Sequence, residues 1–367
     1  MSESTKQFSF VVFGRVISGI LQGLFFLVFA YLLSPHDFGE ISYFIAIAGI
    51  VSVISRFGFN QSALISRSKD NLNLTNEINF LTLIITSIAG VLLIPFNIFI
   101  SVLCIGISFF TMSQHNLLGS KDYKSFMIYS IVKGILMIVV SLILFNFLQI
   151  EGIILGMAIT NLSLSLPFTK NLRLSRFTHI KSNIKFFLNN FGIDTSVHLT
   201  RSIDKIIIVP LLDFTSVGLY QFNLQILLGF EMIPIALHNY LLSEESSNQR
   251  HKKIEFIALL LSIIIIIAVI FLSPIIVPLL FPEYSEGILG LQIMILSLFP
   301  LTLGSIFSAK LQARNSKNSG TAVIVKVVSF VILLFALVQF YDFIGLSIAI
   351  LASYVIYAIY LGILVKK

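Results

Sequence analysis

The sequence has 367 residues, of which 57% are hydrophobic and only 11% are charged. An ordinary soluble domain has about 25% charged residues, and a soluble protein this apolar could not cover its surface with polar groups. Apolar stretches of about 20 residues, long enough to cross a bilayer as a helix, recur along the whole chain and leave no room for a soluble domain. The sequence therefore predicts an integral membrane protein.

The apolar stretches predict an all-α fold. A membrane-spanning segment must satisfy its own backbone hydrogen bonds, so only helices and closed barrels qualify. These stretches lack the alternating polar residues of a barrel strand. Cys104 is the only cysteine, and the six histidines lack ligand spacing, so we expect no disulfide, metal site or cofactor.

Hydropathy predicts about twelve transmembrane helices in chain order. Their predicted ranges are 9–33, 41–65, 78–95, 97–113, 125–147, 152–170, 184–212, 215–241, 254–280, 287–308, 321–340 and 344–365. Pro95-Phe96-Asn97 is the only break between the third and the fourth. An even number of crossings returns the chain to the side on which it starts.

Lysine and arginine accumulate in cytoplasmic loops, and here they alternate completely between successive loops. Of the 24 Lys and Arg residues, 18 lie at the termini and in every second loop. The opposite loops contain none, and their carboxylates are Asp37, Glu40, Glu151, Asp213, Glu283, Glu286 and Asp342. Both termini are therefore predicted to be cytoplasmic. This orientation signal, together with anionic membrane lipids, explains the net charge of +7, which does not indicate nucleic acid binding.

The chain contains a short internal sequence repeat, here called an echo, at an offset of 179 residues. Leu32-Leu33-Ser34-Pro35-His36-Asp37-Phe38-Gly39 resembles Leu211-Leu212-Asp213-Phe214-Thr215-Ser216-Val217-Gly218. A weaker echo pairs 118–122 with 314–318. We therefore predict an N-terminal six-helix lobe at 1–172, a basic cytoplasmic linker at 173–185 and a C-terminal six-helix lobe at 186–367. Two such lobes should be related by a pseudo-twofold axis along the membrane normal.

Charged side chains also occur inside the predicted helices, where each costs about 2.5–3.5 kcal/mol at the bilayer centre. The cations are Arg15, Arg56, Lys133, Arg201, Lys205 and Lys326. The carboxylates are Asp194, Asp204 and Glu231. Because cations outnumber carboxylates, we predict a cationic cavity between the lobes.

Helical spacing groups several of these polar residues on common faces. Asp194, His198, Arg201 and Lys205 form one stripe, Arg15 shares a face with Gln22, and Arg56 shares a face with Asn60. Structural roles remain open for some of them. Arg15, Lys133 and Lys326 could extend to the membrane surface, Arg201 and Asp204 could form an ion pair, and Glu231 could neutralise a neighbouring cation.

A cationic cavity between apolar lobes suits a phosphate-bearing substrate, because arginine binds phosphate oxygens bidentately. Long hydrophobic tails could remain in the surrounding membrane lipids. This combination describes a lipid-linked headgroup.

Three stretches, at 15–67, 201–220 and 284–317, resemble a known family. They include the 32–39 segment, Arg56-Phe57-Gly58-Phe59-Asn60, Arg201-Ser202-Ile203-Asp204-Lys205 and Val217-Gly218-Leu219-Tyr220. The chain resembles the Wzx-type O-antigen flippases, in the polysaccharide transporter branch of the multidrug/oligosaccharidyl-lipid/polysaccharide exporter (MOP) superfamily. The resemblance implies two six-helix lobes and alternating access that carries an undecaprenyl-pyrophosphate-linked oligosaccharide to the outer leaflet. It also implies a bacterial cytoplasmic (inner) membrane and other polysaccharide assembly proteins as partners. The chain departs from the family in being short, and the absence of helices 13 and 14 argues against lipid II as its substrate.

Two other function classes fit the sequence less well. A polysaccharide polymerase or ligase would need a large outer loop, and every outer loop here is short. A MATE-like antiporter of small molecules would share the fold but is expected to have an acidic cavity. No GxxxxGK[ST] motif occurs, so energy is expected to come from the substrate gradient or from a proton or sodium gradient, with Asp194 and Glu231 as the coupling candidates.

Overall fold

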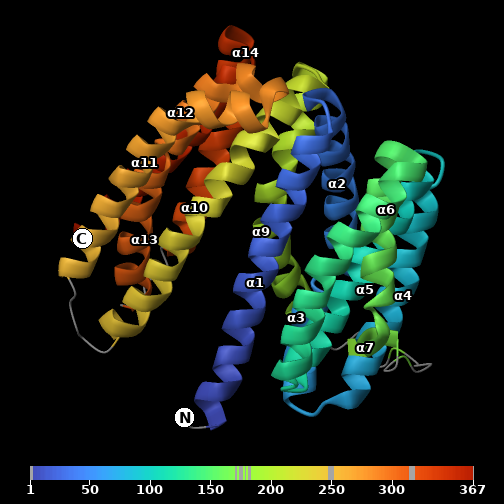
Figure 1. Ribbon diagram of the computed structural model, residues 1–367. Coiled ribbons are helices and arrows are strands. Elements are labelled where there is room, and N and C mark those ends of the chain that lie inside the picture. Colours follow the sequence, from blue (N-terminus) through green and yellow to red (C-terminus); the bar gives the residue numbers. More distant parts are fainter. Residues whose placement is uncertain are drawn as a thin grey trace. The chain divides into compact units, whose positions relative to one another are not determined.

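A computed structural model describes residues 3–169, 172, 177, 179–180, 183–246, 252–313 and 319–366 (Figure 1). Every regular element in these ranges is helical, which confirms the predicted all-α fold. The elements are α1 (Glu3–Leu32), α2 (Pro35–Arg56), α3 (Phe59–Ser68), α4 (Leu72–Leu93), α5 (Ile98–Gly119), α6 (Tyr123–Ser163), α7 (Leu166–Thr169), α9 (Ile184–Leu211), α10 (Phe214–Ser246), α11 (Lys252–Leu280), the 3-10 helix η1 (Pro282–Gly287), α12 (Ile288–Ile295), α13 (Leu298–Ala313) and α14 (Ser319–Lys366).

Within the described ranges, nine helical segments are long and apolar enough to cross a membrane. Two of them, α6 and α14, contain 41 and 48 residues and bend at a single non-helical residue, Gln149 (φ 51°) and Asp342 (φ 47°). These bends fall in the predicted loops 148–151 and 341–343, where the sequence predicts that the chain turns between successive crossings. Helix α9, with 28 residues, is also long enough to cross but is more polar than the others.

Two predicted helices are interrupted in the structure. The helix predicted at 41–65 ends at Arg56 and restarts at Phe59, because Phe57 (φ 48°) and Gly58 (φ 71°) both adopt left-handed conformations. The helix predicted at 287–308 is divided into α12 and α13. Neither interruption contains a charged residue, so hydropathy did not reveal it.

Helix starts are fixed by polar capping side chains. The Asn71 side chain accepts a hydrogen bond from the Leu74 amide, and Asn97 accepts from Phe99 and Ile100. Because Asn71 is the cap, α4 begins at Leu72 rather than at the predicted 78. Glu77 therefore lies inside a helix.

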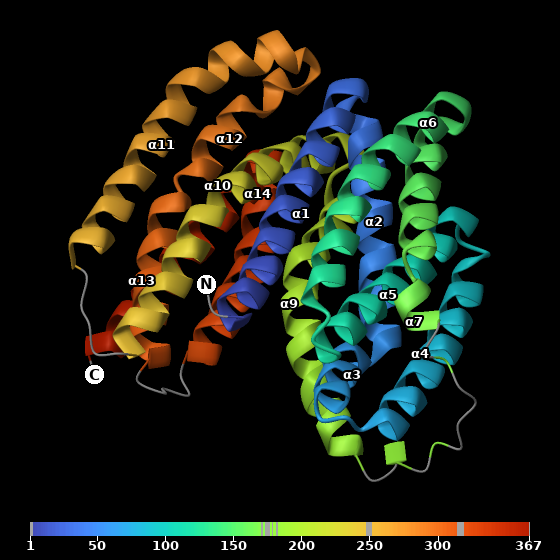
Figure 2. The same cartoon turned by 60° about the horizontal axis from the view of Figure 1, so that its bottom comes forward.

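The chain divides into two compact units. The first contains Met1–Phe25 and Glu40–Ile207, and the second contains Phe26–Gly39 and Ile208–Lys367. In the first unit α5 packs against α3, α4 and α6 (Figure 1). In the second, α13 packs against α10 and α14, and α11 runs beside α12 (Figure 2).

The predicted lobe boundaries stay a prediction. Most of the linker 173–185, and residues 314–318 of the weaker echo, lie outside the described residues.

The stronger echo is described completely and lies in the second unit. A Cβ atom on Gly39 would overlap the Phe214 carbonyl oxygen and lie 2.8 Å from the Gly218 nitrogen. A Cβ atom on Gly218 would overlap the Pro35 carbonyl oxygen and lie 2.7 Å from its carbon. The repeated glycines therefore let the first turns of α2 and α10 approach backbone to backbone.

Candidate functional site

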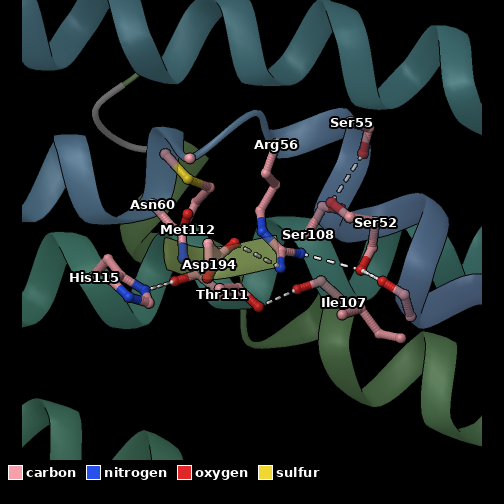
Figure 3. A network of polar contacts seen from close by, with 12 residues as sticks. Ser52, Ser55, Arg56, Asn60, Ile107, Ser108, Thr111, Met112, His115 and Asp194 are labelled. Carbon is pink, nitrogen blue, oxygen red and sulfur yellow. Dashed lines mark hydrogen bonds and ion pairs between the residues drawn. The ribbon is translucent and has the colours of Figure 1, made fainter. Parts of the chain in front are cut away.

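Among the cations of the first unit whose side chains are described, the most buried is Arg56, the last residue of α2. Its side chain is only 1% exposed. Its Nη1 atom donates a hydrogen bond to Ser52 Oγ at 3.2 Å, one turn earlier in the same helix. Its Nη2 atom lies 3.8 Å from Asp194 Oδ2 on α9 (Figure 3). The structure thus supplies a buried arginine with one nearby carboxylate.

Asn60 binds the other oxygen of the same carboxylate. Its Nδ2 donates to Asp194 Oδ1 at 2.9 Å. Arg56 and Asn60 both reach Asp194 because the left-handed turn at Gly58 separates α2 from α3. A Cβ atom on Gly58 would overlap the Phe191 nitrogen and lie 2.7 Å from the Asn190 carbonyl carbon, so α9 passes directly against this turn.

The pairing of Arg56 is incomplete. A distance of 3.8 Å is longer than a charge-assisted hydrogen bond, which spans about 2.7–2.9 Å. The Arg56 Nε atom is buried and has no hydrogen-bond partner among the described residues. An unsatisfied donor of this kind in a low-dielectric interior is costly, and it can be satisfied by an anion. This arrangement gives Arg56 the chemistry needed to bind phosphate oxygens in competition with Asp194.

The other predicted cations of the first unit have different surroundings. Lys205 Nζ lies 3.1 Å from Asp204 Oδ1, and both side chains are buried. Lys133 Nζ lies 4.6 Å from the centre of the Phe110 ring. In the described part of the chain, Lys133 has no carboxylate within ion-pair distance. Arg15 and Gln22 are exposed on α1.

In the second unit, Glu231 and Lys326 both contact Tyr354. The Tyr354 hydroxyl donates to Glu231 Oε1 at 2.6 Å, and Lys326 Nζ lies 4.5 Å from the centre of the Tyr354 ring. Within the first unit the structure brings together Arg56, Asn60 and Asp194, and within the second unit it brings together Glu231 and Lys326. His198 and Arg201 belong to α9, but their side chains lie outside the described residues.

Two contact residues were absent from the sequence analysis. Glu77 is 2% exposed and accepts hydrogen bonds from the amides of His179 and Ile180 at 2.9 and 3.1 Å. It was missed because α4 starts earlier than predicted. Tyr354 was missed because a tyrosine in an apolar run resembles any other packed aromatic residue.

One group of side chains has metal-ligand character. Ligand atoms of His36, Asp37 and Glu40, in the first two turns of α2, lie within 4.8 Å of one another. His36 is exposed, and exposed acidic groups of this kind are common without an ion. No role is assigned to this group.

Comparisons with known proteins place the fold. No protein-family model and no curated protein sequence matches this chain. The chain is similar to an inward-facing multidrug resistance MATE family transporter of the MOP superfamily, with a TM-score of 0.77 and 14% identity over 97% of each chain. It is also similar to the lipid II flippase MurJ in an inward closed conformation, with a TM-score of 0.76 and 18% identity over 97% of this chain and 88% of that chain. An outward-facing MATE transporter matches with a TM-score of 0.63 and 15% identity, over 97% and 93% of the two chains. The chain therefore has the same fold as these MATE and MurJ structures.

Proposed function

We propose that this protein is a flippase that moves a lipid-linked oligosaccharide across the bacterial cytoplasmic membrane for assembly of a surface polysaccharide. Its substrate is an undecaprenyl-pyrophosphate-linked repeat unit, carried from the cytoplasmic to the outer leaflet by alternating access. It is a transporter rather than an enzyme, and both of its termini are cytoplasmic. The fold similarity to transporters, including a lipid II flippase, supports this class.

The observation that carries the proposal is the buried guanidinium of Arg56. It is 1% exposed, has an unsatisfied Nε donor and stays 3.8 Å from its carboxylate, beyond hydrogen-bond distance. Holding a cation in this state is costly, and a structural ion pair would be expected to close to hydrogen-bond distance. A pyrophosphate supplies several oxygen acceptors in the geometry that a guanidinium binds best.

The remaining charges fit the same substrate. Lys133 rests against an uncharged ring, so its positive charge is not cancelled there. Away from the terminal residues of the predicted helices, six cations against three carboxylates favour an anionic cargo. Asp194 and Glu231 are buried carboxylates and are the proposed sites of coupling to a proton or sodium gradient.

The second candidate function is a MATE-like antiporter of small cations. The matching MATE structures favour it, because they share the fold over nearly the whole chain. Buried Asp194 and Glu231 could serve cation exchange as well as coupling. The two functions differ in the sign of the charge on the cargo, because a flippase substrate is anionic and a MATE-like substrate is cationic. Arg56 would attract the first and repel the second.

Reconstitution of the protein into liposomes distinguishes the flippase from the antiporter. The full chain is placed in proteoliposomes with an undecaprenyl-pyrophosphate-linked oligosaccharide, and transfer between leaflets is followed by the accessibility of the glycan to a lectin. We expect transfer by the wild type, strong loss with Arg56→Ala, partial recovery with Arg56→Lys, and no change with Lys252→Ala, which removes an exposed cation at the start of α11. Uptake of ethidium without glycan transfer would overturn the proposal in favour of the antiporter.

A further inference from the structure

The second unit holds an arrangement of one cation, two tyrosines and one carboxylate, in which the carboxylate is buried and the other three side chains are half-buried. Lys326 Nζ lies 4.5 Å from the centre of the Tyr354 ring and 5.8 Å from the centre of the Tyr357 ring. The Tyr354 hydroxyl donates to Glu231 at 2.6 Å. Glu231 is only 8% exposed. We call these four residues the tyrosine cradle.

The bend of α14 at Asp342 creates the cradle. Because the helix reverses there, Lys326 before the bend faces Tyr354 and Tyr357 after it. Gly345 lets the two arms meet closely, since a Cβ atom at that position would lie 2.6 Å from the Leu337 carbonyl oxygen. Thus one long helix supplies both the cation and the rings.

The two tyrosines are held by other helices. Gly304 of α13 leaves space for the Tyr357 ring, because a Cβ atom there would lie 2.6 Å from Tyr357 Cε1. Glu231 of α10 fixes the hydroxyl end of Tyr354. Glu231 precedes Pro234, which interrupts the backbone hydrogen bonding of α10 near this point.

The two rings of the cradle contribute no negative charge to the surroundings of the lysine. An aromatic ring attracts an ammonium group through its quadrupole but carries no net charge, so it holds the cation without cancelling it. A carboxylate that accepts a hydrogen bond from the phenol increases electron density in the ring and strengthens this attraction. Glu231 therefore acts on Lys326 through Tyr354, in addition to any direct attraction.

We propose that Tyr354 is a positioning residue that holds Lys326 as a phosphate-binding cation for the polyprenyl pyrophosphate part of the substrate. This inference rests on the proposed function and deepens it. Tyr357 forms the second wall of the cradle, and Glu231 orients Tyr354.

Farnesyl pyrophosphate is a suitable probe, because it carries the same headgroup on a short chain. Its dissociation constant is measured by calorimetry on the purified full chain in nanodiscs. Lys326→Ala and Tyr354→Leu should each weaken binding, by about threefold to thirtyfold for the lost ring contact. Tyr354→Phe keeps the ring and should cost less, about twofold to threefold. The matched control is Tyr360→Phe, because Tyr360 lies on the same arm of α14 and bonds Thr321 instead.

A double-mutant cycle separates positioning from general damage. Tyr354→Leu should have no further effect once Lys326 is alanine. An equal loss in both backgrounds, or no loss with Tyr354→Leu in a chain that elutes and melts like the wild type, would overturn the inference. If Lys326→Ala and Arg56→Ala weaken binding but Tyr354→Leu does not, only the cradle is wrong. If the wild type does not bind farnesyl pyrophosphate, the proposed function and the cradle both fail.

Discussion

The turn at Gly58 allows the sharpest prediction about the first unit. Gly58 has φ +71° and its missing Cβ faces the backbone of Asn190 and Phe191. Alanine in the left-handed conformation costs about 1–2 kcal/mol. Displacing the backbone of α9 adds about 1–3 kcal/mol, as over-packing does in other cores. Gly58→Ala should therefore destabilise the first unit by about 2–5 kcal/mol.

The measurement uses Cys104, the single cysteine of the chain. Its side chain is 0% exposed, so a thiol-reactive dye labels it only when the first unit opens. The labelling midpoint on heating should fall clearly for Gly58→Ala. Gly23→Ala and Gly192→Ala should keep or slightly raise it, because a Cβ atom at either position meets nothing within 4 Å. A Gly58→Ala midpoint equal to that of the Gly192 variant would refute the argument that this turn requires glycine.

Three further predictions concern buried contacts. Asp194→Ala leaves Arg56 as an uncompensated buried charge and should cost about 3–5 kcal/mol in the thiol-labelling assay, whereas the double alanine variant should cost less; a double variant whose cost equals the sum of the two single costs would show that the pair does not interact. Glu77→Gln weakens two charge-assisted hydrogen bonds, so hydrogen exchange of the His179 amide should become faster, and unchanged exchange would contradict the observed bond. Gly39→Ala forces the first turns of α2 and α10 apart and should lower thermal stability by about 1–3 kcal/mol, and a variant as stable as the wild type would count against the close backbone contact.

The helical layout could be predicted because polar residues punctuate the apolar runs. The break at 94–97 contains Pro95 and Asn97, and the bends at Gln149 and Asp342 coincide with short segments that contain a polar or charged residue. The turn at Phe57-Gly58 could not be detected in the same way. Arg56 and Asn60 flank this turn at helical spacing, so the sequence predicts one continuous helical face. In the structure Phe57 and Gly58 adopt left-handed backbone conformations and end the helix.

The candidate site could be predicted only as a set of charged residue types. Helical spacing suggested that Asp194 and Lys205 share one stripe on α9. In the structure Asp194 contacts Arg56 and Asn60, while Lys205 pairs with the adjacent Asp204. Which residue each charged side chain pairs with depends on the tertiary contacts between α9 and its neighbours. The periodicity of a single helix gives no information about these contacts. The contacts of Tyr354 with Glu231 and Lys326 could not be predicted for the same reason.

The most direct test of the central claim is deletion of the gene in its native host, with complementation by the wild type or by Arg56→Ala. The account predicts that lipid-linked glycan accumulates on the cytoplasmic leaflet and surface polysaccharide disappears. The wild type should restore both, and a correctly inserted Arg56→Ala variant should restore them poorly. Unchanged surface polysaccharide in the deletion strain, or single repeat units that still reach the surface, would contradict the flippase function.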